Sequence, residues 1–351
     1  MSANLPGTPP PYSDRGADAE GLHKDAQLDA LADDMGVDLW ETERDALSIH
    51  QLRALAGELG RLPGISTVLD LVGEHGRERA TALVRGWLTR EAEREVDKFG
   101  CDHAFVAQAE PVMAWFHDHY FRVAATGVEN IPSTGRVLVV ANHSGTLPYD
   151  AAMVVATARI RHPDHRLLRP LVENFVYHFP FLGMFMARAG AVRACQENAQ
   201  MLLQEDEAVL VFPEGVKGIG KLFRKRYRLQ RFGRAGAVRL ALKTGSPIVP
   251  CAIVGAEEAM PLLSKMTWLA GPLGLPYIPI TPTLPFLGPL GLLPFPTKWF
   301  IDFGEPIDVS RYGPDALGDR VLVNRLNEEV RSVVQRMIDA RLAQRQSVFF
   351  G

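Results

Sequence analysis

The stretch "RVLVVANHSGTLPYD", residues 136–150, decides the fold class because it joins an apolar run to a polar turn. The run 136–141 is short and rich in β-branched residues, which is typical of a buried strand. A helical pattern begins at 149, directly after the turn. A strand that leads through a short turn into a helix is the repeating unit of an α/β sheet. Such sheets place their chemistry in the loops at the carboxyl ends of their strands, and this loop contains His143 and Asp150.

The same alternation of strands and helices continues along the chain. Short runs rich in β-branched residues predict strands at 136–141, 167–172, 190–194, 208–212, 247–254 and 299–303. Helical patterns predict helices at 149–160, 196–205, 234–244 and 318–344. We therefore expect residues 123–351 to form one α/β domain, a sheet with helices on its faces.

The residues before this domain differ in composition. Residues 1–22 are rich in Pro, Gly and Asp and are predicted to be a disordered tail. Residues 23–122 follow helical spacing without strand-like alternation, which predicts a helical N-terminal region. Residues 1–100 carry 19 acidic and 11 basic side chains, whereas the remainder carries 22 and 27. Positive charge is thus concentrated in the part that would meet an anionic partner.

Length and composition place the chain among globular proteins. Its 351 residues are enough to bury a core, and 47% of them are hydrophobic. Three cysteines, an odd number spread far apart, imply no disulfide framework, so a reducing cytoplasm is the expected location. The first residues lack the basic and apolar regions of a secretory signal, and secretion is not expected.

Two interpretations of the loop after the first strand are open. Asp150 falls at the start of the predicted helix, where exposed N–H groups favour a carboxylate, so it would cap the helix while His143 is unrelated to it. Alternatively, the loop folds back and Asp150 accepts a hydrogen bond from one imidazole nitrogen. That bond would fix the tautomer and leave the other nitrogen as a general base. Gly145 and Pro148 would shape such a turn.

A second carboxylate follows another predicted strand. In "AVLVFPEGVKG", residues 208–218, the strand leads to Glu214, which is followed by Lys217; an ordinary turn with an exposed glutamate is the alternative. Ten Lys or Arg and no acidic residue lie between 217 and 243, which suits a phosphate-bearing ligand or an anionic bilayer. A solvated surface loop is the alternative for this basic run. Nucleic acid is not expected as a partner, because few aromatics accompany these charges and the net charge of the chain is −3.

Several familiar sites are not predicted. "GVKGIGKL", residues 215–222, nearly spells a phosphate-binding P-loop, but Leu222 stands where the motif needs a hydroxyl to ligate magnesium. The G-x-S-x-G elbow of serine hydrolases does not occur. His117 and His119 flank Asp118, but no cysteine or acidic cluster completes a zinc set, so no metal site is expected.

One long segment carries no charge. Residues 266–297 contain eight prolines and four glycines but no Asp, Glu, Lys or Arg. Each internal proline removes a helix hydrogen bond, and a membrane-spanning segment must satisfy every backbone group, so a transmembrane helix is not expected. The segment would dip into the membrane interface, line an apolar pocket, or form a buried proline-rich loop.

Four motifs, taken in order, resemble the glycerolipid acyltransferase family, also called the lysophospholipid acyltransferase or PlsC-like superfamily. They are "VANHSGTLPYD" (140–150), "GAVRA" (190–194), "VFPEG" (211–215) and "SPIVPCAIVG" (246–255). A fifth stretch, "FGEPI" (303–307), is similar to a strand end of the family. The resemblance covers residues 123 to about 310. It implies a mixed sheet flanked by helices and an acyltransferase activity.

The resemblance implies a role for each motif. His143 would remove the proton from an acceptor hydroxyl and Asp150 would orient the imidazole. The hydroxyl would then attack the thioester of acyl-CoA or of an acyl-carrier protein, without a further cofactor. Residues of the other motifs would hold the substrate near the histidine: Arg193, Phe212, Pro213, Glu214, Gly215 and Lys217. The acceptor would be a lipid hydroxyl, and the enzyme would lie as a peripheral protein on the cytoplasmic face of the membrane.

The sequence departs from the family pattern at two places. Six residues separate His143 from Asp150 where the family has four, and "VKG", residues 216–218, stands where the family has an arginine and a serine. These departures favour the branch that acylates neutral alcohols, such as diacylglycerol or long-chain alcohols, over lysophospholipid acceptors. Two other functions stay open: a non-catalytic lipid-binding protein of the same fold, which the wide spacing would suit, and a thioesterase, in which the same base would act on water.

Overall fold

The computed structural model describes residues 96–351, except 145–146, 179–181, 268–269, 271–274 and 285. All of the described residues fall within one of the two contact-defined units of the chain, His75–Gly351. The predicted tail 1–22 and most of the predicted helical region 23–122 lie outside the described residues.

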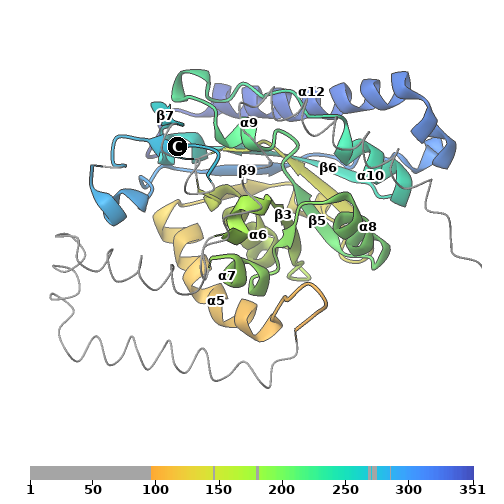
Figure 1. The fold of residues 1–351 in the computed structure, drawn as a ribbon, viewed down its shortest axis with the longest axis horizontal. Helices are drawn as coiled ribbons and strands as arrows, with labels where there is room; N and C mark the ends of the chain where they lie inside the picture. The colour runs from red at the N-terminus through yellow and green to blue at the C-terminus, as the bar shows by residue number, and fades with distance from the viewer. Residues whose placement is uncertain (1–95, 145–146, 179–181, 268–269, 271–274, 285) are drawn as a thin grey trace, which may run out of the picture. The chain divides into compact units, whose positions relative to one another are not determined.

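A seven-stranded sheet forms the centre of the described unit (Figure 1). Its strands lie in the order β1-β9-β6-β2-β5-β3-β4. Their bounds are β1 Ala124–Thr126, β2 Val137–Ala141, β3 Leu168–Val172, β4 Val192–Arg193, β5 Ala208–Val211, β6 Ile248–Val254 and β9 Phe300–Phe303. Neighbouring strands are parallel except β6 and β9, which are antiparallel. The expected mixed α/β sheet is confirmed.

Helices cover the faces of this sheet. The α-helices are α5 His103–Trp115, α6 Tyr149–Arg161, α7 Leu182–Arg188, α8 Gln196–Gln204, α9 Val216–Ile219, α10 Gly236–Thr244, α11 Ala256–Ala259 and α12 Arg320–Gln344. Short 3-10 helices are η3 Val128–Asn130, η4 Asn174–His178, η5 Phe223–Lys225, η7 Gly288–Leu292, η8 Ser310–Tyr312 and η9 Pro314–Gly318. All four helices predicted from the sequence are present as α6, α8, α10 and α12.

The alternation of side chains along β2 explains why helices lie on both faces. Val137 and Val139 point into a core cluster formed with α6, whereas Leu138 and Val140 point into a second cluster formed with α8, α10 and α12. Every residue of β2 is fully buried. A strand that is apolar on both sides belongs in the middle of a two-sided sheet, where it holds the following loop in a fixed position.

Residues 103–121 pack on the same core. Helix α5 continues into a π-helical turn, η2 (Phe116–Tyr120), which contacts α6. Phe121 follows, fully buried, with its ring centroid 4.4 Å from that of Trp299. This end of the predicted helical region therefore shares the core of the α/β domain. A division between a helical region and that domain stays a prediction for the residues before 96.

The uncharged segment 266–297 is partly buried and partly exposed. It pairs as a small hairpin, β7 (Ser264–Met266) with β8 (Ile278–Ile280), and buries Tyr277 beneath it. Phe286, by contrast, is 77% exposed. Within the described part of the chain, no helix is long and apolar enough to cross a membrane.

Candidate active site

The loop after β2 folds back onto the first turn of α6. Asp150, the second residue of that helix, turns a fully buried carboxylate toward the loop. Its Oδ2 accepts a hydrogen bond from His143 Nδ1 at 2.6 Å and another from the backbone N–H of Ser144 at 2.8 Å. Its Oδ1 accepts from the N–H of Ala151 at 2.8 Å. Asp150 thus accepts hydrogen bonds both from the start of α6 and from the imidazole, although six residues separate it from His143.

The imidazole of His143 is held in one orientation. A carboxylate can only accept, so Nδ1 carries a proton, and in the neutral ring the lone pair is on Nε2. The ring lies against Phe212, with 4.4 Å between the centroids and 23° between the planes. The side chain retains 15% exposure, so the ring is not sealed from solvent. This is the arrangement of a general base with an oriented second nitrogen.

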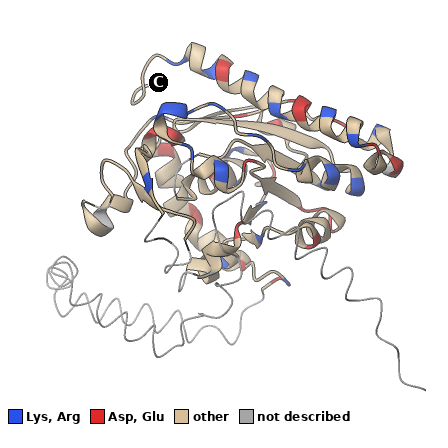
Figure 2. Cartoon of the chain, turned by 45° about the horizontal axis from the view of Figure 1, so that its top comes forward, with Lys and Arg blue, Asp and Glu red and all other residues tan. Residues whose placement is uncertain are grey.

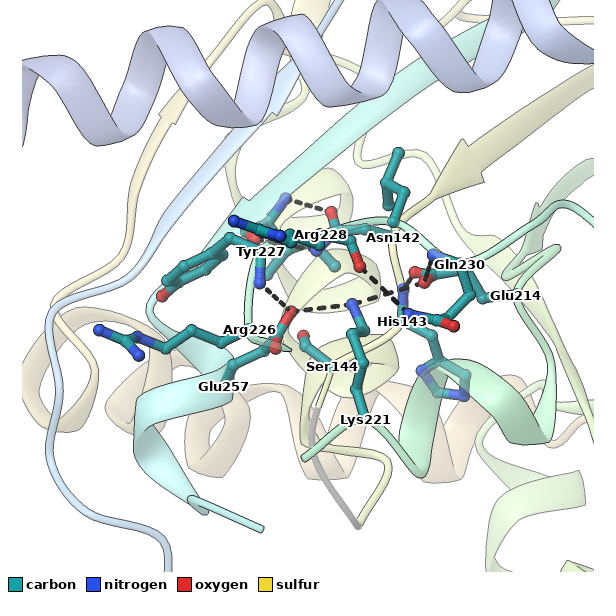
Figure 3. A network of polar contacts seen from close by, with 12 residues as sticks. Asn142, His143, Ser144, Glu214, Lys221, Arg226, Tyr227, Arg228, Gln230 and Glu257 are labelled. Carbon is teal, nitrogen blue, oxygen red and sulfur yellow. Dashed lines mark hydrogen bonds and ion pairs between the residues drawn. The ribbon is translucent and has the colours of Figure 1, made fainter. Parts of the chain in front are cut away.

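Strand β5 delivers the residues of the second motif to the same edge of the sheet. Phe212 is buried under the imidazole, and Pro213 follows it half-buried. Glu214 is buried, and its Oε1 accepts from the backbone N–H of His143 at 2.9 Å. Its Oε2 accepts from the N–H of Gln230 at 2.6 Å (Figure 3). The structure therefore gives Glu214 a role in fixing the loop after β2, while a contact of this residue with substrate stays a prediction.

A buried ionic network extends behind Glu214. Lys221 Nζ lies 3.4 Å from Glu214 Oε2 and donates to Glu257 Oε1 at 3.0 Å (Figure 3). Glu257 also accepts from the N–H of Tyr227 at 3.1 Å. Burial raises the pKa of Glu257, and the charge of Lys221 opposes that shift. Lys221 is almost wholly buried, so its charge requires both carboxylates as partners.

Helix α9 brings the rest of the motif against His143. Gly215 precedes it at φ 55° and ψ −147°, a conformation that side chains disfavour. At Gly218, a Cβ would lie 2.8 Å from the Cβ of His143 and 2.7 Å from that of Glu214. The helix can approach the histidine this closely only because residue 218 has no side chain.

A basic pocket of about 390 Å³ opens beside α9. Four lysines line it: Lys217, Lys221, Lys225 and Lys265. The other lining residues are Gly220, Leu222, Gln230 and Ser264. Lys221 is already paired with Glu214 and Glu257, so Lys217, Lys225 and Lys265 give the pocket its charge for an anionic group. Partial burial lowers the pKa of Lys265, which comes from strand β7 and was not foreseen as a site residue.

Two further residues lie at the ends of neighbouring strands. Arg193, at the end of β4, is exposed and donates from Nε to Asn174 Oδ1 at 2.6 Å. It is three strands away from β2 in the sheet order. Glu173 directly follows β3, and its Oε1 lies 3.6 Å from where a Cβ on Gly215 would be. Desolvation raises the pKa of Glu173, and His143 opposes this shift in its protonated form.

Sequence reasoning missed the residues that support the dyad from behind. Lys221 appeared only as one cation of the basic run, and Gln230 and Glu257 were not singled out. The sequence does contain a signal for Glu257, because this carboxylate follows the end of strand β6 in the same way as Glu214 follows the end of strand β5. Among the described residues, no group of three or more His, Cys, Asp or Glu is arranged to hold a metal ion.

Comparisons with known proteins place this geometry in a family. A family model described as "Acyltransferase" matches residues 122–254. An uncharacterized protein of Mycobacterium tuberculosis is 42% identical over 313 residues, 88% of this chain and 87% of that protein. A 1-acyl-sn-glycerol-3-phosphate acyltransferase of Borreliella burgdorferi is 27% identical over 144 residues, 39% of this chain and 53% of its own. The crystal structure of PlsC, the 1-acyl-sn-glycerophosphate acyltransferase of Thermotoga maritima, is 20% identical with a TM-score of 0.47, covering 76% of this chain and 93% of its own.

Proposed function

The chain belongs to the glycerolipid acyltransferase (PlsC-like) superfamily, and we propose that it moves a fatty acyl group from a thioester to a lipid hydroxyl with His143 as general base. The observation that carries the proposal is the 2.6 Å hydrogen bond from His143 Nδ1 to Asp150 Oδ2. This bond fixes the tautomer in which Nε2 can accept a proton. The side chain of His143 is also 15% exposed, so a substrate can reach the ring.

The reaction follows from this tautomer. Nε2 takes the proton of the acceptor hydroxyl while the oxygen forms a bond to the thioester carbonyl carbon. The tetrahedral intermediate then breaks its carbon–sulfur bond, and the leaving thiolate takes the proton from the imidazolium. The products are an ester and a free thiol, and no acyl-enzyme forms. Asp150 stabilises the imidazolium in between, as an oriented carboxylate does in other histidine-based mechanisms.

The substrates are proposed from the charges around the dyad. The donor is acyl-CoA or an acyl-carrier protein, and both carry phosphate. The acceptor is a lysophospholipid, a diacylglycerol or a long-chain alcohol. The lysine pocket next to α9 supports a phosphate on at least one of the two substrates. The printed name of the Borreliella relative supports a lysophospholipid acceptor, whereas the departures from the family motifs favour a neutral alcohol.

We place the enzyme on the cytoplasmic face of the membrane as a peripheral protein. Cys101, Cys195 and Cys251 are all free thiols, which suits a reducing compartment. The basic run between 217 and 243 suits the anionic cytoplasmic leaflet.

A labelled acyl-CoA, offered with a panel of lysophospholipids, diacylglycerol and long-chain alcohols, tests the proposal. Wild-type protein should form one labelled ester, whose identity names the acceptor. His143→Ala should lower kcat by about 10²–10⁴-fold, because the proton acceptor is lost. Asp150→Asn should lower it as well, because an amide can donate to Nδ1 and stabilise the wrong tautomer.

The same assay separates the alternatives. His143→Ala with full activity and an unchanged unfolding temperature would remove the general-base assignment. Fatty acid release that does not depend on an acceptor would instead indicate a thioesterase. Acyl-CoA binding without turnover across the panel would indicate a lipid-binding protein of the same fold.

A further inference from the structure

We propose that the protein docks on an anionic lipid bilayer through one face next to the candidate active site; this rests on the proposed function in taking the acceptor to be a membrane lipid and the enzyme to be a peripheral membrane protein. The face is formed by six exposed apolar side chains, called here the docking face: Phe286, Leu287, Leu292, Leu293, Phe349 and Phe350.

The exposure of these side chains is high for apolar groups. Phe350 is 89% exposed and Phe286 is 77% exposed, and the other four lie between 44% and 56%. Single exposed leucines are ordinary, but six large apolar side chains from two adjoining segments form a surface that water solvates poorly. Their burial in the bilayer interface would remove that apolar surface from water.

Hydrogen bonds hold the first segment in a defined turn. Thr281 Oγ1 accepts from the N–H of Leu284 at 2.8 Å. Thr283 binds across the turn twice: its Oγ1 donates to the carbonyl of Gly291 at 3.0 Å, and its own carbonyl accepts from the N–H of Leu287 at 2.8 Å. The apolar side chains are therefore presented on a fixed backbone, which lowers the entropy lost when they bind.

Arg122 joins the second segment to the first. Its Nη2 donates to the carbonyl of Pro296 at 2.7 Å and to that of Phe349 at 2.8 Å. The N–H of Lys298 donates to the carbonyl of Val348 at 2.9 Å. Residues 348–350 are thus tied beside the end of the uncharged segment. Figures 1 and 2 both show the C-terminus and the segment with η7 toward the same end of the domain.

The docking face adjoins the dyad. The hydroxyl of Tyr149 donates to the carbonyl of Leu292 at 2.9 Å, and Tyr149 directly precedes Asp150 on α6. The hydroxyl of Tyr120 donates to the carbonyl of Pro294 at 2.6 Å.

The charges around the face favour an anionic bilayer over a neutral one. No Asp or Glu occurs in residues 259–301 or 340–351. The cations that border the two segments are Arg122, Lys265 and Lys298. Arg345 is not counted, because its side chain is buried and ion-paired with Glu258. An apolar surface bordered by cations and free of carboxylates in its own segments matches the headgroup region of a bilayer that contains acidic lipid.

Vesicle co-sedimentation of the full chain tests the proposal. The probes are phosphatidylcholine vesicles with and without phosphatidylglycerol, at low salt and without substrates. Leu293→Ser/Phe350→Ser should lower partition into the anionic vesicles by about tenfold or more, because two interfacial side chains lose their apolar surface. Val321→Ser is the matched control, since Val321 is 80% exposed at the start of α12 and should bind as wild type does.

The outcomes separate docking from catalysis. His143→Ala should bind vesicles like wild type, and the double variant should acylate a short-chain, water-soluble acceptor at the wild-type rate. Equal partition of wild type and double variant would overturn the docking face. Wild-type protein that does not bind anionic vesicles would overturn it as well. So would a double variant that differs from wild type only in its oligomeric state. A chain that docks but transfers no acyl group would contradict the proposed function alone.

Discussion

At the scale of single residues, the candidate base is fixed from three directions. Asp150 holds Nδ1 of His143, Phe212 packs against the ring, and Glu214 binds the backbone N–H. These contacts come from two parts of the chain, the start of α6 and the motif after β5, so the position of the imidazole depends on the pairing of β2 with β5. The activity of a base that is held in this way falls when the residues that position it move by about 0.5–1 Å.

Gly218 is the residue where this dependence is easiest to test. An alanine Cβ there would meet the Cβ atoms of His143 and Glu214 at 2.8 and 2.7 Å, so one of them must move. We expect Gly218→Ala to lower kcat by tenfold or more and to destabilise the fold by about 1–3 kcal/mol, as overpacking does. Steady-state kinetics and urea unfolding would measure the two effects.

The matched control is Gly318→Ala. A Cβ on Gly318 meets nothing within 4 Å, and this glycine lies in η9, away from the dyad. We expect wild-type kinetics and a change in stability of no more than about 0.5 kcal/mol. Wild-type kcat in Gly218→Ala would show that the close approach of α9 does not position the histidine.

At the scale of elements, η2 is linked to α6 by a buried histidine. His117 is fully buried, with Nδ1 2.6 Å from Asp118 Oδ1 and Nε2 3.2 Å from Thr157 Oγ1. Burial lowers its pKa below the ordinary value of 6.5, and the neighbouring Asp118 opposes that shift. The folded protein therefore keeps this imidazole neutral at a pH where the unfolded chain already binds a proton.

The sign of the pH dependence follows from that difference. Above about pH 6.5 neither state binds the proton, so this contribution to stability is complete; as the pH falls below that value, the unfolded state gains protons first and stability is lost. We expect the unfolding free energy of His117→Gln to fall less steeply between pH 7 and pH 5 than that of wild type. Urea titrations at several pH values would measure the slopes.

The control for this prediction removes a different histidine. His103 is exposed at the start of α5, so His103→Gln should keep the wild-type slope. Parallel slopes for wild type and His117→Gln would mean that the buried imidazole takes up no fewer protons than the unfolded chain does.

The elements also show what the sequence can predict. Strands such as β2 and β6 and the helix α12 were predictable, because a continuous apolar run rich in β-branched residues and an apolar pattern of period 3.6 are set by the chain itself. Strand β1 and the β7–β8 hairpin were not. Each has only three residues per strand and forms by pairing with a partner, which local patterns do not encode.

The candidate site divides in the same way. The hydrogen bond from His143 to Asp150 was one of two stated interpretations, because both residues lie in one loop of recognisable sequence. The contacts of Lys221 were not foreseen. They depend on the path of the loop that carries Lys221 after β5, and on Glu257, which lies 36 residues further along the chain. Such burial of a cation between carboxylates is a property of tertiary packing.

At the scale of the whole molecule, residues 101–351, which contain the candidate site, carry a net positive charge although the net charge of the chain is −3. A positive field attracts anionic substrates over a distance, and each cation contributes to it. A lysine that binds phosphate directly does more than this. Its removal weakens binding locally, whereas the removal of a distant lysine changes only the field, which salt screens within about 8–10 Å.

This difference provides a test of the pocket with two variants that each lose one positive charge. Lys265→Ala removes a cation from the pocket wall, and Lys243→Ala removes an exposed cation from the last turn of α10. At physiological salt, we expect Lys265→Ala to raise KM for the phosphate-bearing substrate by about fivefold to tenfold, as the loss of a charge-assisted hydrogen bond does. Lys243→Ala should leave KM unchanged, and kcat should be close to wild type in both.

KM measured for acyl-CoA against its dephospho form, and for lysophosphatidic acid against monoacylglycerol, identifies the substrate whose phosphate is bound. Equal KM values for the two variants across all four substrates would mean that Lys265 acts only through the general field and that the pocket is not a phosphate site.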